Sequence, residues 1–357
     1  MIKRNSRLEI VRLLAMFGIV LSHWGGHNEA IFSPDSGLLI NNIWLLFCQQ
    51  FGELGNALFI LITGYFSINQ RFTKRHIINF AITVEFYSVL VYIICLCTGI
   101  CSFSVVDIVK SIFPIMYSSY WFVVPYFFLY LFIPLLNKII NELYNDKLNY
   151  LIVVLVLVET LLPIIKADTI SSNFGLFILY YIIGALIRIK CSFNNTENKL
   201  ESPEESGKWI LINNLIRDHG FLLTGICFFI LVTVSILSVV LRSDMVLLLA
   251  QLMLGRFSIF TAIISIYIFI KLASGSPFSN GFINWVSKTS FSMYLISENY
   301  NIYPWLWKKY FNNLYSFKSL GFIPKSVASV LTVMVICSVI DSFRILMFNC
   351  IHRLKNK

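Results

Sequence analysis

The sequence predicts an all-helical protein that crosses a membrane about ten times, with both termini in the cytoplasm. The chain of 357 residues is 57% hydrophobic and only 13% charged, and its mean hydropathy is +0.77. Soluble proteins carry about twice that share of charged residues. Long apolar stretches recur from one end of the chain to the other. These observations exclude a soluble domain with a single membrane anchor.

Each predicted span is a stretch of about 20 mostly apolar residues, the length that an α-helix needs to cross a bilayer. The fifth and sixth stretches are short, and the ninth is polar for a span. In chain order, the predicted spans are 8–26, 50–69, 77–99, 120–139, 149–165, 174–190, 220–241, 248–272, 282–303 and 326–350.

We expect one membrane domain over residues 1–357. Its predicted parts are a six-span block (1–190), a flexible cytoplasmic linker (191–219) and a four-span block (220–357). Lysines and arginines gather in the loops and termini that this topology places inside the cell. The net charge of +10 therefore indicates membrane topology, and we expect no nucleic-acid partner.

The cysteines predict no metal site. Cys95, Cys97 and Cys101 cluster near the end of one predicted span, but no histidine lies nearby. Small apolar packing residues are the simpler interpretation of this group. The basic start MIKRNSR is followed by no small-residue cleavage site, so we expect no cleaved signal peptide.

The first predicted span contains the pair of residues around which we expect the chemistry to be organised. Arg12 and His23 are eleven positions apart, which is within ~20° of three full helical turns and about 16 Å along the helix axis. Both side chains therefore lie on one stripe. Ionisable groups in an apolar helix usually face the protein interior or a wet cavity. The pair predicts a polar path that enters from one membrane face.

His23 is the candidate catalytic residue, because an imidazole takes up and returns a proton near neutral pH. His27 lies four residues further on, on the same face of the helix. Gly25 and Gly26 intervene and are expected to break the helix there.

Further ionisable residues lie in or near the predicted spans. Glu53 is an i,i+3 neighbour of Asn56 near the outer end of the second span and is expected to face the same half as His23. An unpaired charge in hydrocarbon is costly, so the others are each expected to have a partner or water. They are Glu85, Glu159, Arg256 and Glu298.

Aromatic residues mark the start of the fourth span. Tyr120 and Trp121 form an interfacial belt or, alternatively, a platform on which a sugar ring stacks. Pro125 and Pro134 are expected to kink this helix. Gly64 in the second span is expected to allow close approach of a neighbouring helix.

Four segments in order resemble the membrane-bound acyltransferase-3 family of bacterial O-acyltransferases. The spacing from Arg12 to His23 is similar to that family's first-span signature. LFILITGYF (58–66) resembles its FF-x-x-SG-[YF] element, and YWFVVPYFFLYLFIPLLN (120–137) its YWF…P-x-LN element. SFSMYLISENYNIYPWLW (290–307) resembles the late YLIH segment, with Ser297 at the histidine position.

The resemblance implies a ten-span enzyme of the bacterial cytoplasmic membrane. It would transfer an acyl group, usually acetyl, from cytosolic acetyl-CoA to a hydroxyl of a surface polysaccharide or its lipid-linked precursor. His23 carries over as the catalytic histidine and Arg12 as its essential partner. No cofactor is implied, because acetyl-CoA is the donor substrate. Candidate substrate-binding residues are Glu53, Tyr120, Trp121, Arg256 and Glu298.

Two mechanisms remain open for His23: general base, or nucleophile that forms an acetyl-histidine. A different class of function also remains open. A proton-coupled transporter or flippase of lipid-linked glycans would use the intramembrane glutamates, Arg256 and His23 as a relay. No internal repeat of the kind found in many transporters is visible, and this favours the enzyme.

Overall fold

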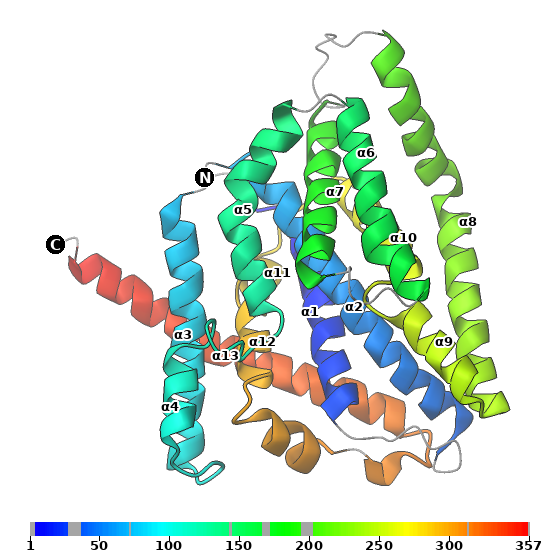
Figure 1. Ribbon diagram of the computed structural model, residues 1–357. Coiled ribbons are helices and arrows are strands. Elements are labelled where there is room, and N and C mark those ends of the chain that lie inside the picture. The colour runs from blue at the N-terminus through cyan, green and yellow to red at the C-terminus, as the bar shows by residue number, and fades with distance from the viewer. Residues whose placement is uncertain are drawn as a thin grey trace. The chain divides into compact units, whose positions relative to one another are not determined.

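Every regular element in the described part of the chain is a helix, as predicted (Figure 1). The computed structural model describes residues 4–27, 37–70, 73–142, 145–165, 172–193, 203–312 and 314–355. The α-helices are α1 (Ser6–His27), α2 (Leu39–Ser67), α3 (Lys74–Cys97), α4 (Val105–Ile112), α5 (Val123–Glu142), α6 (Asn145–Val156), α7 (Asn173–Phe193), α8 (Pro203–Leu241), α9 (Asp244–Leu254), α10 (Ile259–Ala273), α11 (Gly281–Lys288), α12 (Ser290–Ser297) and α13 (Phe322–Lys355).

Within the described residues, seven helical segments are long and apolar enough to cross a membrane. They are Ser6–His27, Leu39–Ser67, Lys74–Cys97, Val123–Glu142, His219–Leu241, Asp244–Ala273 and Phe322–Cys350, and a shorter apolar helix covers Asn173–Ile189. These segments support a multi-pass membrane protein. The number of ten spans and the cytoplasmic position of the termini remain predictions.

The predicted span 282–303 is wrong as a single helix. α11 ends at Lys288, α12 begins at Ser290, and each is only eight residues long. The hydroxyl of Thr289, at the junction, donates to the carbonyl of Val286, and that of Ser292 donates to the carbonyl of Thr289. Such local bonds compete with a continuous helical ladder, and this explains the break.

The predicted span 248–272 is also interrupted. α9 ends at Leu254 with Gly255 as its C-terminal cap, and Ser258 caps the start of α10 by accepting a hydrogen bond from the amide of Phe260. Arg256 lies in the short break between these two helices. Its guanidinium bonds to the side chains of Glu53 and Asn173.

Two further predicted boundaries differ from the structure. The expected flexible linker 191–219 is helical from Pro203 onward, because α8 begins there; residues 194–202 lie outside the described part of the chain. The fifth predicted span starts as α6 and continues through a π-helical turn, Leu157–Leu161, and a 3-10 turn, Leu162–Ile165.

The chain forms two compact units, each discontinuous in sequence. The first unit comprises Met1–Gly52, Ile78–Val124 and Pro277–Lys357, and the second comprises Glu53–Ile77 and Pro125–Ser276. The division along the sequence into a six-span and a four-span block remains a prediction.

Glycines allow close helix packing in both units. In the first unit, a Cβ on Gly18 would overlap the carbonyl oxygen of Phe51, so α1 and α2 approach backbone to backbone. In the second unit, a Cβ on Gly64 would overlap the carbonyl oxygen of Tyr181, and one on Gly184 that of Leu61. α2 and α7 are therefore in close contact there, which confirms the expectation for Gly64.

The asparagine that ends the 120–137 segment joins three helices of the second unit. The amide of Asn137 donates to the carbonyl of Ser67 at 3.0 Å, and its oxygen accepts from the hydroxyl of Tyr181 at 2.6 Å. In the 58–66 segment, Thr63 bonds to the hydroxyl of Tyr126 at 2.9 Å. These polar residues of the two segments therefore support the fold.

Candidate active site

α1 carries both predicted site residues on one continuous helix from Ser6 to His27. Since no break separates Arg12 from His23, helical geometry places them on one stripe, as predicted. α1 contacts α11, α12, α13 and the π-helical segment Pro304–Tyr310 of the same unit (Figure 1). The groups that surround the two side chains come from α1 itself, from these partners and from the residues that flank them.

His23 and His27 both face the carboxylate of Glu298. Oε2 of Glu298 lies 3.0 Å from Nδ1 of His23, and Oε1 lies 2.7 Å from Nε2 of His27. The first contact is close but not aligned as a hydrogen bond, whereas the second is a well-formed hydrogen bond. The side chains of His23 and Glu298 are each 12% exposed, and that of His27 is 25% exposed. We call these residues the His–Glu–His triad.

The end of α12 sets the position of Glu298. α12 stops at Ser297, and Glu298 follows as its C-terminal cap, with its amide bonded to the carbonyl of Tyr294. The hydroxyl of Tyr120 donates to the carbonyl of Leu295 at 3.0 Å and accepts from the amide of Asn299 at 2.9 Å. Tyr120 thus binds the backbone of α12 before Glu298 and the side chain of Asn299, the residue that follows it.

Aromatic rings enclose the two imidazoles. The ring centroid of Tyr294 lies 5.6 Å from that of His23, and Tyr303 stacks on His27 at 4.1 Å with an interplanar angle of 21°. Water has little access to a carboxylate in such a setting, so its charge acts strongly on the neighbouring imidazoles. Ser297, the last residue of α12, is fully buried next to Glu298.

The structure corrects the expectation that α1 breaks at Gly25 and Gly26. The helix continues through both glycines to His27. Gly25 packs closely against α2, because a Cβ there would lie 3.1 Å from the Cβ of Cys48. His27 therefore stays in helical register, one turn beyond His23, and reaches the same carboxylate.

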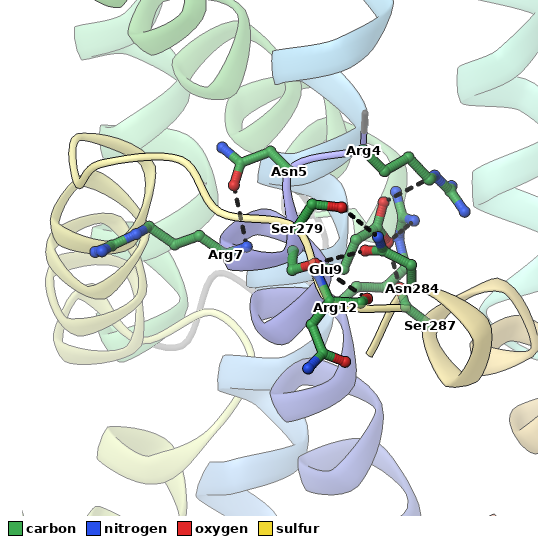
Figure 2. A network of polar contacts seen from close by, with 10 residues as sticks. Arg4, Asn5, Arg7, Glu9, Arg12, Ser279, Asn284 and Ser287 are labelled. Atoms are coloured by element: carbon green, nitrogen blue, oxygen red, sulfur yellow. Dashed lines mark hydrogen bonds and ion pairs between the residues drawn. The ribbon is translucent and has the colours of Figure 1, made fainter. Parts of the chain in front are cut away.

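Arg12 lies in a separate polar cluster near the start of α1 (Figure 2). Its guanidinium donates to Oε2 of Glu9 at 2.7 Å, and Nε of Arg4 lies 3.2 Å from Oε1 of the same carboxylate. The hydroxyl of Ser287, from α11, also donates to Glu9. Glu9 is almost fully buried, and Arg4 is 42% exposed. We call these four residues the arginine cluster.

Among the described residues, the four members of the arginine cluster have a net charge of +1, because two guanidiniums share the carboxylate of Glu9. Arg7 belongs to the same stretch, but its side chain points away from Glu9 (Figure 2). Sequence reasoning missed Glu9, although its i,i+3 spacing to Arg12 was a visible signal. Ser287 gave no such signal, since its contact depends on tertiary packing.

Glu53 and Arg256 form an ion pair within the second unit. Nε and Nη2 of Arg256 lie 3.1 and 3.4 Å from the two oxygens of Glu53, and Nη1 donates to Asn173 at 2.8 Å. Asn56 also donates to Glu53, at 3.1 Å. Glu53 thus has these partners within the second unit, and the carboxylate that contacts His23 is that of Glu298 in the first unit.

The remaining candidates have separate positions. Tyr120 is 1% exposed, so its ring is buried in the protein and supports the segment around Glu298. Trp121 is half-buried and packs edge-on against Phe122. Glu159 is buried and accepts a hydrogen bond from the amide of Ser172 at 2.8 Å, so it caps the start of α7. Glu85 is exposed on α3.

No group of three or more His, Cys, Asp or Glu side chains suited to a metal ion occurs among the described residues. The His–Glu–His triad places two imidazoles on one carboxylate, which is an arrangement suited to proton transfer. The arginine cluster provides cationic groups near the other end of α1.

Comparison with known families assigns the chain. A model described as an acyltransferase domain, that of the acyltransferase 3 family, matches residues 5–341. Comparison with curated proteins and with solved structures finds no match. The matched range includes α1, the Tyr120 support and all three residues of the His–Glu–His triad. The chain therefore belongs to the acyltransferase 3 family.

Proposed function

We propose that this acyltransferase moves an acetyl group from cytosolic acetyl-CoA to a hydroxyl of a surface polysaccharide or of its lipid-linked precursor. The proposed location is the bacterial cytoplasmic membrane, with the lipid bilayer as its surroundings. The observation that carries the proposal is that His23 contacts Glu298 and lies on the same helix as Arg12, α1. Acyl transfer to a sugar needs a base for a weakly acidic hydroxyl, and an imidazole held by a carboxylate supplies one.

We propose different roles for the two nitrogens of His23. Nδ1 faces Glu298, so Nε2 is the nitrogen left to meet the acceptor. Nε2 takes the proton of the sugar hydroxyl while its oxygen forms a bond to the thioester carbonyl carbon. The carbon–sulfur bond breaks, and the proton on Nε2 passes to the departing thiolate of CoA. The misaligned Glu298 contact is expected to tighten when substrate is bound.

The arginine cluster is the proposed binding site for the phosphate groups of CoA. Its net positive charge and the exposed Arg4 suit an anionic ligand, and a guanidinium binds phosphate through paired hydrogen bonds. Glu53, Arg256 and Trp121 are proposed as acceptor-binding residues, and Tyr120 as a support of the Glu298 segment.

Replacing Arg12 with glutamine is expected to raise the KM for acetyl-CoA by about 10–100-fold, the effect of losing one charged hydrogen bond to phosphate. Glu9 remains paired with Arg4 and Ser287 in this variant, so the fold is retained. Arg7→Gln is the matched control, because its side chain points away from the cluster (Figure 2). An unchanged KM in Arg12→Gln would place the donor elsewhere.

The proposed function is tested with membranes that contain the protein, radiolabelled acetyl-CoA and the lipid-linked glycan of the host. We expect alkali-labile label in the glycan, and none with membranes that lack the protein. Glycan movement across vesicles without any dependence on acetyl-CoA would instead identify a transporter or flippase.

A further inference from the structure

Glu298 is held mainly by His27 and not by His23. The bond from Nε2 of His27 to Oε1 is short and aligned, whereas Nδ1 of His23 is near Oε2 without hydrogen-bond alignment. A carboxylate at the end of a short helix has freedom to rotate about its side-chain bonds. The position of Oε2 against the catalytic imidazole thus depends on what holds Oε1.

Three features of the chain hold His27 in place. α1 continues through Gly25 and Gly26, so His27 keeps its helical position one turn beyond His23. The ring of Tyr303 stacks on the imidazole at 4.1 Å and fixes its plane. The carboxylate itself is anchored through the backbone that Tyr120 and Asn299 support. Among the described residues, the titratable side chains placed against the two imidazoles are Glu298, Tyr294 and Tyr303.

We infer that His27 is a positioning residue for the transfer reaction: its Nε2–H donates to Oε1 of Glu298 and keeps Oε2 directed at Nδ1 of His23. The inference rests on the proposed role of His23 as the base. His27 does not touch the reacting atoms. Its contribution is to keep the base in one tautomer and one orientation, so that Nε2 is ready for the acceptor hydroxyl.

Two substitutions separate the hydrogen bond of His27 from its packing. His27→Gln keeps a side-chain N–H donor and loses the aromatic stack on Tyr303. His27→Phe keeps a ring against Tyr303 and loses the donor. We expect kcat to stay within about 3-fold of wild type in the glutamine variant and to fall by about 10–100-fold in the phenylalanine variant, with KM unchanged in both, because a small misplacement of a catalytic group costs up to about 10²-fold.

The readouts are kcat and KM in the acetyl-transfer assay, with the melting temperature as a check of folding. His27→Leu removes both the hydrogen bond to Glu298 and the stack on Tyr303. It is a second variant without a donor, and we expect the same loss of kcat as in His27→Phe. If activity is retained in His27→Phe and lost in His27→Gln, the aromatic ring matters and not the hydrogen-bond donor. That result would overturn the inference in favour of packing. Equal activity in the glutamine and phenylalanine variants, high or low, would also overturn it.

Failure of the inference is distinguishable from failure of the proposed function. If His23→Ala retains full transferase activity, the base itself is wrongly assigned. If His23→Ala is inactive while the two His27 variants are equal, His23 remains the base and only the role of His27 is lost.

Discussion

Replacing His23 with alanine is expected to reduce acetyl transfer by about 10²–10⁴-fold, the usual contribution of a positioned general base. The variant keeps Arg12, so binding of acetyl-CoA and its KM are expected to be near wild type. The measurement is the rate of alkali-labile label appearing in glycan, at equal protein level in the membrane. Glu298 remains bonded to His27 in this variant, so a buried unpaired charge does not arise and the fold is retained.

The matched control is His219→Ala, which removes the same side chain from an exposed position on α8. Its rate is expected to equal that of wild type. A rate for His23→Ala within a few-fold of wild type would remove this imidazole from the chemistry. An inactive His219→Ala would indicate that the assay reports protein integrity and not catalysis.

Much of the fold was predictable because the physical constraint is simple. A chain that buries its backbone in hydrocarbon must form helices, and long apolar stretches show where they lie. The breaks were not predictable from hydropathy. α11 and α12 separate at Thr289, and α9 and α10 separate around Arg256, because hydroxyl and capping bonds replace helical ones. Hydropathy averaged over a window does not register such local bonds.

The site was only half predictable for a related reason. Helical periodicity placed Arg12 and His23 on one stripe, since both belong to one helix. The partners of His23 and Arg12 depend on which distant segments pack against α1. Glu298 is 275 residues from His23 in sequence, and Ser287 is 278 residues from Glu9. No spacing rule connects residues so far apart, so the sequence predicted that Glu298 would have a partner but not that this partner would be His23.

Replacing Glu298 with glutamine tests whether the charge of the triad matters beyond its shape. The substitution is nearly isosteric, so the side chain keeps its shape between the two imidazoles, but the negative charge that faces His23 and His27 is lost. The glutamine side chain has one oxygen that accepts hydrogen bonds, and its NH₂ group would face one of the two imidazoles. It therefore cannot accept a hydrogen bond from both His23 and His27. We expect kcat to fall by about 10²–10⁴-fold, in line with carboxylates that orient a catalytic histidine elsewhere.

Glu298→Asp is the informative companion, because it keeps the charge and shortens the reach to the two imidazoles. We expect it to be intermediate, with a loss of about 10-fold, since orientation is impaired while charge remains. Glu142→Gln, at an exposed position on α5, is the control for loss of a carboxylate and is expected to match wild type. A Glu298→Gln variant as active as wild type would mean that His23 works without a charged partner. The contact between His23 and Glu298 would then be part of the packing of α12 against α1.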